Sequence, residues 1–379
     1  MKIVIFGLTV SSSWGNGHAT LWRGLIKALS RRGHEVTFFE RDVPYYARHR
    51  DISELFGARL ILYRDWSEIL PEARRQLREA DAGVVTSYCP DAISASDVLL
   101  EANGTSVFYD LDTPVTLNRL QAGENVEYVG PRGLRDFDLV LSYTGGTALQ
   151  FLETELGATR VAPLYGSVDP EVHKPVGAVE MFQCDLSYLG TYAADRQKTL
   201  EELFVEPARR VPQRKFLIGG AQYPEKFPWA KNIFFASHVA PADHPAFYSS
   251  SRLTLNVTRA AMARMGYCPS GRLFEAAASG APIVSDYWEG LEEFFQPGSE
   301  MILARAAEDV VNALDLSAAE LKNISRAARE RTLAQHTAAQ RAIDFEKVLR
   351  DAQNCRSVAR NVDHGARNTE HEETLTSIN

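Results

Sequence analysis

Short apolar runs alternate with amphipathic stretches along the whole chain, and the alternation restarts near residue 170. Residues 3–6, for example, form an apolar run, and Leu21, Leu25 and Leu29 then recur at helical spacing. Strands that alternate with helices form parallel sheets covered on both faces, joined by right-handed crossovers. The pattern therefore predicts an α/β protein with two doubly wound domains.

The expected elements follow from this rhythm. The strands of the first half are predicted at residues 3–6, 35–40, 60–63, 83–86, 106–109 and 138–142. Those of the second half are predicted at 186–189, 216–218, 233–235, 253–255, 283–285 and 302–303, with helices at 196–204, 272–279 and 307–314. Two such domains would face each other across a cleft, because open α/β sheets bind ligands at the carboxyl ends of their strands.

Turn-forming residues between 166 and 177 mark the expected domain boundary. We place the first Rossmann-like domain at 1–168 and the second at 169–336. Two closing helices are predicted at 317–336 and 338–351, with Ser317 as N-cap before Glu320. The second of them defines a closing segment at 337–352, and the polar segment 353–379 lacks periodicity and is expected to be a disordered tail.

Charge and cysteine content exclude several classes of protein. The net charge is −8 and the basic residues are scattered, so no stable binding to nucleic acid is expected. The four cysteines lie far apart in sequence, which argues against a disulfide framework or a zinc site and fits a reducing compartment. The apolar run at the N-terminus has only four residues, too few for a signal peptide or a membrane span. We expect a cytoplasmic protein without a membrane span.

The loop after the first strand runs from Gly7 directly into a predicted helix. Its spacing lacks the dinucleotide-binding glycine fingerprint, which disfavours a nicotinamide oxidoreductase. His18 stands in the first turn of that helix, and histidine changes charge near neutral pH, which suits a general base. Ser12, Asn16 and Gly17 are the loop residues expected at the acceptor; the alternative is that His18 only caps the helix.

Two carboxylates follow the strand predicted at 106–109. Asp112 is a candidate base, a partner that orients His18, or a ligand of a sugar hydroxyl. Asp110 alternates with it and is expected on the same side. In the alternative interpretation, Asp112 caps the turn before Pro114.

The second half carries a stronger constellation. After the strand at 186–189, the backbone at Gly190, Thr191 and Arg196 could hold a diphosphate. Farther along, Ser270 precedes a helix that has Arg272 in its first turn, where a cation opposes the helix dipole unless an anion binds there. Glu275 lies one turn later and suits two vicinal ribose hydroxyls. The alternative is an Arg272–Glu275 ion pair on the protein surface.

The residues Phe274-Glu275-Ala276, with Gly280 and Pro282, resemble the donor-binding helix of GT-B glycosyltransferases. The sequence most resembles the group related to the spore maturation protein CgeB, over nearly the full length to about residue 350. That resemblance also covers the segments at 108–114, 256–259, 270–286, 288–291 and 294–295.

The resemblance implies roles for single residues. Glu275 would bind the donor ribose, Arg272, Thr191 and Arg196 would lie near the phosphates, and Arg259 would belong to the same half-site. His238 and Val239 would lie beside the nucleobase, and His18 matches the position of the base in many inverting members. The first half is then the acceptor side and the second half the donor side.

Two departures from the family pattern bear on mechanism. Many retaining members carry two glutamates eight positions apart, but the first of these positions is Tyr267 here. The Asp110-Leu111-Asp112 triplet is spelled like a metal site but lies on the acceptor side, so no metal and no cofactor are expected. The nucleotide-sugar is a co-substrate, with UDP, dTDP and GDP left open.

The sequence therefore predicts a cytoplasmic glycosyltransferase, of the hexosyltransferase type, that acts on an unidentified hydroxyl acceptor. Two alternatives stay open. A sugar-nucleotide epimerase on the same fold would need no acceptor, and a non-catalytic nucleotide- or sugar-binding protein would show no turnover.

Overall fold

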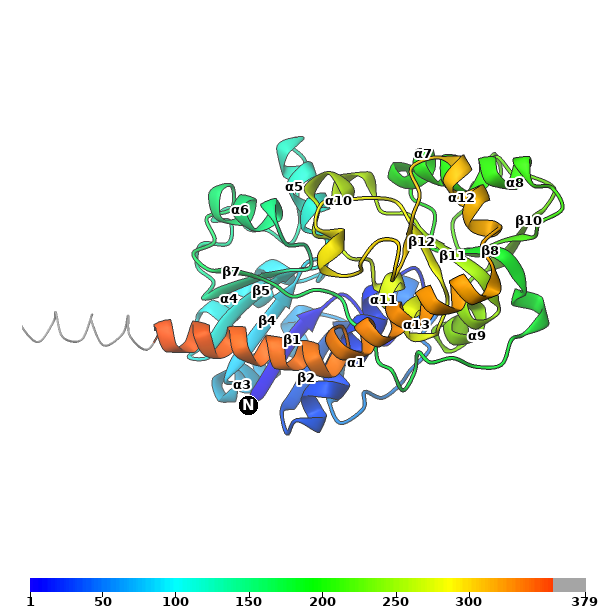
Figure 1. The fold of residues 1–379 in the computed structure, drawn as a ribbon. Coiled ribbons are helices and arrows are strands. Elements are labelled where there is room, and N and C mark those ends of the chain that lie inside the picture. The colour runs from blue at the N-terminus through cyan, green and yellow to red at the C-terminus, as the bar shows by residue number, and fades with distance from the viewer. Residues whose placement is uncertain (357–379) are drawn as a thin grey trace, which may run out of the picture.

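A computed structural model describes residues 1–356 of the chain. Two parallel α/β domains lie side by side, and the chain crosses between them twice (Figure 1). The prediction of two doubly wound domains is confirmed. The four cysteines form no disulfide. Within the described residues, no helix is both long and apolar enough to cross a membrane.

The first domain contains a seven-stranded parallel sheet in the order β3-β2-β1-β4-β5-β6-β7. Its strands are β1 (Lys2–Gly7), β2 (Glu35–Arg41), β3 (Arg59–Tyr63), β4 (Ala82–Thr86), β5 (Thr105–Asp110), β6 (Leu139–Ser142) and β7 (Val161–Pro163). Its helices are α1 (His18–Arg31), α2 (Pro44–Ala47), α3 (Trp66–Glu79), α4 (Ala92–Leu100), α5 (Thr113–Gln121) and α6 (Thr147–Thr154). The strand order changes direction between β1 and β4, so the loops after these two strands flank the crevice in which such sheets bind ligands.

The second domain contains a six-stranded sheet in the order β10-β9-β8-β11-β12-β13. Its strands are β8 (Cys184–Leu189), β9 (Phe216–Gly220), β10 (Ile233–Ser237), β11 (Ser251–Asn256), β12 (Ile283–Ser285) and β13 (Ile302–Leu303). Its helices are α7 (Gln197–Leu200), α8 (Glu206–Arg210), α9 (His244–Ser249), α10 (Ala260–Met265), α11 (Gly271–Ala278), α12 (Ala307–Leu314) and α13 (Ala318–Gln335). Here the order changes between β8 and β11, which places the loops after those strands at the corresponding crevice.

Alternating side chains of each strand face opposite layers of helices. In β1, Ile3 and Ile5 pack toward α1, whereas Val4 and Phe6 pack toward α3 and α4. All four side chains are at most 2% exposed, as expected for a parallel sheet covered on both faces.

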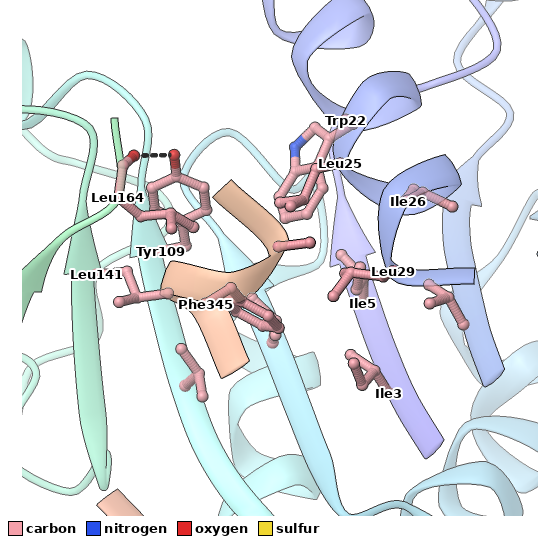
Figure 2. Close-up of a cluster of buried hydrophobic side chains, with 14 of the residues drawn as sticks. Ile3, Ile5, Trp22, Leu25, Ile26, Leu29, Tyr109, Leu141, Leu164 and Phe345 are labelled. Atoms are coloured by element: carbon pink, nitrogen blue, oxygen red, sulfur yellow. Dashed lines mark hydrogen bonds between the residues drawn. The ribbon is translucent and has the colours of Figure 1, made fainter. Parts of the chain in front are cut away.

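The last described helix, residues 338–356, returns to the first domain after α13 has packed on the second (Figure 1). Phe345 of this helix lies with Ile5 and Leu25 in one buried cluster, beside the hydrogen bond from the Tyr109 hydroxyl to the Leu164 carbonyl (Figure 2). The prediction of a disordered tail from residue 353 is wrong for 353–356, because these residues continue the helix. The rest of that tail lies outside the described residues.

Both crossings between the domains run together. The backbone of Val168 accepts a hydrogen bond from Ala338 and donates one to His336, at 2.8 and 3.0 Å. These two hydrogen bonds join the linker to the connection between α13 and the last helix, because both segments pass Val168. The Ser317–Glu320 capping box predicted at the start of α13 is present.

Candidate functional site

A cavity of about 500 Å³ opens between the two domains and is lined from both. From the first domain come the loop after β1, the start of α1 and the loops after β4 and β5. From the second come the loops after β8 and β11 and the start of α11. Both switch points of the two sheets therefore meet in one cleft.

His18 and Asp112 face each other on the first-domain wall. The His18 Nε2 atom lies 3.9 Å from Oδ1 of Asp112, and the two side chains are 24% and 16% exposed. The other oxygen of Asp112 accepts a 3.0 Å hydrogen bond from the Tyr88 hydroxyl. Neither residue caps a helix with its side chain: Asn16 accepts the His18 backbone N–H, and Asp112 precedes α5 without a capping bond.

Asp110 does not reach the cleft, contrary to the expectation that it shares a side with Asp112. Its side chain is fully buried beneath the wall, and Oδ1 accepts the backbone N–H of Asp112. Burial raises the pKa of Asp110 to about 6. The prediction that Ser12 lies at the acceptor is also wrong, because Ser12 is buried and its hydroxyl donates to the His49 carbonyl. Both residues stabilise the loops instead of lining the cavity.

Arg272 lies at the start of α11 and is held by three hydrogen bonds. Its guanidinium donates to the carbonyls of Leu189 and Val257 and to the Ser270 hydroxyl, at 2.9, 3.1 and 3.0 Å. A Cβ on Gly190 would lie 2.9 Å from this guanidinium, so a larger residue there would displace Arg272 from its position. The predicted alternative of a surface pair with Glu275 is wrong, because the two side chains bond to different partners.

Positive charge gathers on this wall. Arg272 stacks over the ring of Tyr188, and Arg196 donates to the Tyr188 hydroxyl at 3.2 Å. Although burial opposes it, the two guanidinium groups lower the pKa of Tyr188. Arg196 keeps a buried Nε without a hydrogen-bond partner in the described chain. Together with the amides that begin α11, these groups give the wall a positive character that suits an anion.

Glu275 lies one turn into α11, where it is 7% exposed and lines the cavity. Its neighbours are His244 at 3.3 Å, the Thr20 hydroxyl at 3.4 Å and His173 at 3.7 Å. Burial disfavours charge on this carboxyl, but these neighbours together lower its pKa. The possible ligand atoms of His173, His244 and Glu275 lie within 4.8 Å of one another.

The remaining predicted residues are distributed along the same cavity. Asn16, Gly17, Thr191, His238, Val239, Arg259 and Ser270 all line it. Arg259 is paired with Asp195 at 2.9 Å, which leaves it less available to an anion than Arg196. Tyr267 does not line the cavity; its ring packs against Gly146 of the first domain.

Sequence reasoning missed Tyr88, Tyr143, Thr20 and His244, which also line the cavity. Tyr88 follows β4 at the switch point of the sheet, so its position just after a strand could have predicted that it lines the cleft. It also has a positive φ of 65°, a strained backbone that no sequence pattern reveals. His244 begins a six-residue helix, and no sequence pattern predicted that it lines the cleft.

Two facing doubly wound domains with a shared cleft define the GT-B class of fold. Residues 196–347 match the protein family described as Glycosyl transferase-like, which covers most of the second domain.

Solved structures share the whole two-domain arrangement. Sucrose-phosphate synthase from Thermosynechococcus elongatus superposes with a TM-score of 0.69 and 15% identity, covering 94% of this chain and 100% of that chain. Anabaena HepE in complex with UDP-glucose gives 0.64 and 12%, covering 93% and 100%. An alpha-glucosyltransferase in complex with UDP-glucose and DNA gives 0.64 and 13%, covering 92% and 99%. No curated protein sequence matches the chain significantly. The resemblance to the CgeB-related group stays a prediction.

Proposed function

We propose that this protein transfers a sugar from a nucleoside-diphosphate donor to a hydroxyl acceptor, without a catalytic metal. One observation carries the proposal: a histidine–aspartate pair faces a cationic helix start across a single cavity of about 500 Å³. That volume suits a small-molecule ligand. The similar structures that contain UDP or UDP-glucose make UDP the first donor nucleotide to test.

The proposed reaction uses groups from both walls. His18 or Asp112 accepts the proton of the acceptor hydroxyl, and the acceptor oxygen forms a bond to the anomeric carbon. The bond from that carbon to the diphosphate breaks, and its electron pair leaves with the nucleoside diphosphate. Arg272, Arg196 and the amides of α11 then stabilise the added negative charge.

Ribose recognition is assigned to Glu275 in the same proposal. An ionised carboxylate only accepts hydrogen bonds, which matches two neighbouring ribose hydroxyls. Its low pKa keeps it ionised at neutral pH. His238 and Val239, from the loop after β10, are proposed to lie beside the nucleobase.

The test is a thermal-shift panel with UDP, dTDP, GDP, ADP and CDP, followed by turnover of the corresponding glucose donor. A ligand at 100 times its Kd stabilises the fold by about 2.7 kcal/mol, which is a shift of several degrees. Binding of none of the five nucleotides would contradict the proposal. Donor isomerisation without acceptor would favour an epimerase, and binding without turnover a non-catalytic protein.

A further inference from the structure

The carboxylate of Glu275 is contacted from three separate parts of the chain. Thr20 of α1 in the first domain donates to Oε1 at 3.4 Å. His244, at the start of α9, places Nδ1 3.3 Å from Oε2. His173, in the linker between the domains, places Nε2 3.7 Å from Oε1. A carboxylate this buried needs polar neighbours to stay ionised, and here they come from both domains and the linker.

His173 has an unusual environment for a histidine. Its side chain is 5% exposed, and neither ring nitrogen has a hydrogen-bond partner among residues 1–356. Burial lowers its pKa, so the ring is neutral at neutral pH and can present one N–H to Glu275. A small rotation of the carboxylate would shorten the 3.7 Å approach to a hydrogen bond. Buried polar groups without partners are rare, and those that persist call for an explanation.

The linker that carries His173 is fastened to α1. Lys27 binds Asp169 at 2.7 Å and Glu171 at 2.8 Å, and the His173 backbone N–H donates to the Asp169 carbonyl at 2.8 Å. The same helix carries His18 and Thr20 at its other end. One rigid helix therefore joins the catalytic wall, the linker and the ribose carboxylate.

We propose that His173 is a positioning residue for the donor ribose, which orients the Glu275 carboxylate from the linker side. His244 lies beside the other oxygen, and Thr20 completes the arrangement only when the two domains are close together. Ribose recognition is thereby linked to domain closure. This inference rests on the proposed function, because it requires Glu275 to accept hydrogen bonds from a ribose.

The same three side chains also offer ligand atoms for a metal ion, and the zinc arm of the experiment below separates the two roles. A zinc site would need nitrogen and oxygen ligands about 2.0–2.2 Å from one centre, and hence about 3.3 Å from each other. The His244 Nδ1 atom lies 3.3 Å and the His173 Nε2 atom 3.7 Å from a Glu275 oxygen, and all the possible ligand atoms lie within 4.8 Å of one another.

The experiment compares the Kd of UDP with that of 2′-deoxy-UDP by calorimetry, in the full chain and in single variants. His173→Phe preserves the ring volume but removes the N–H group. His173→Gln keeps a donor at this position. Glu275→Gln removes the charge of the acceptor, and His336→Phe is the matched control, because His336 is equally buried but stacks on Phe274 at 4.6 Å.

We expect the wild-type protein to prefer UDP by about tenfold or more, as one hydrogen bond to a charged group allows. His173→Phe should reduce this preference about three- to tenfold through weaker UDP binding, with 2′-deoxy-UDP little changed and thermal stability equal or higher. Glu275→Gln should abolish most of the preference, His173→Gln should restore part of it, and His336→Phe should leave it intact.

An unchanged preference in His173→Phe, or an equal loss for both nucleotides, would overturn the inference while leaving the proposed function in place. A wild-type preference that disappears with EDTA and returns with zinc would overturn it in favour of a metal site. Failure of the wild-type protein to bind UDP or any other nucleotide of the panel would instead refute the proposed function, and the inference with it.

Discussion

Asp110 offers a quantitative test of how this cleft is built. Its carboxyl is fully buried under the first-domain wall of the cavity, and Oδ2 has no hydrogen-bond partner within the described chain. Burial raises its pKa from 3.8 to about 6, whereas hydrogen bonds from Thr116, the Asp112 backbone and Ser87 only partly oppose the rise. The ionised form is therefore less stable in the folded protein than in the unfolded chain.

The sign and size of the effect follow from this difference. Since the folded state binds the proton more tightly, the contribution of Asp110 to stability is complete below about pH 3.8 and is lost as the pH rises through about 6. A difference of roughly two pH units corresponds to about 3 kcal/mol. Asp110→Asn cannot ionise, and its side-chain oxygen can still accept the Asp112 backbone N–H.

We expect Asp110→Asn to be more stable than the wild-type protein at pH 7.5 by up to about 3 kcal/mol, or roughly 5 °C in apparent Tm. The gain should shrink as the pH falls toward 4. Thermal unfolding of both proteins from pH 4 to 8 measures it. Asp65→Asn is the control: hydrogen bonds from Ser67 lower the pKa of Asp65, so this variant should show no gain at pH 7.5. A gain for Asp110→Asn that is absent at pH 7.5, or equally large at pH 4, would refute the reasoning.

Four further predictions concern the site. His18→Ala should lower turnover by about 10²–10⁴-fold and leave the affinity for UDP unchanged. If Asp112 only orients His18, the double variant with Asp112→Asn should be little slower than His18→Ala. Near-normal turnover in both single variants would place the base elsewhere. Glu275→Ala should weaken donor binding by roughly 10- to 100-fold in calorimetry, and unchanged binding would remove it from the site. Turnover should survive EDTA, so complete loss that magnesium or manganese restores would contradict the metal-free mechanism. Gly146→Ala should loosen the contact between the domains, because its Cβ would lie 2.4 Å from the Tyr267 ring. We expect weaker UDP binding and a larger radius of gyration in solution scattering. Gly123→Ala is the control for the free-energy cost of a non-glycine residue at positive φ, because Gly123 also has a positive φ but has open space around it.

The sequence by itself determined the elements and which second-domain residues line the cavity. Local periodicity marked the strands and the helix of residues 271–278, because burial on one face repeats with the period of the element. The turn residues on either side of that helix fixed where it begins and ends. Since parallel strands all present their carboxyl ends at one edge, residues after β8 and β11 could be expected together, and Thr191, Arg259 and Arg272 do line one cavity.

Only the tertiary structure decided which segments meet across the chain. The helix at 338–356 has an apolar stripe, but a stripe does not specify which domain it covers. Its packing on β1 and α1 follows from the second crossing at Val168. Burial of Asp110 and exposure of Asp112 depend on how β5 ends against its neighbours, which a two-residue alternation does not specify. His173 lies about a hundred residues before Glu275, and their approach is set by the linker path, because contacts between distant segments leave no local pattern in a sequence.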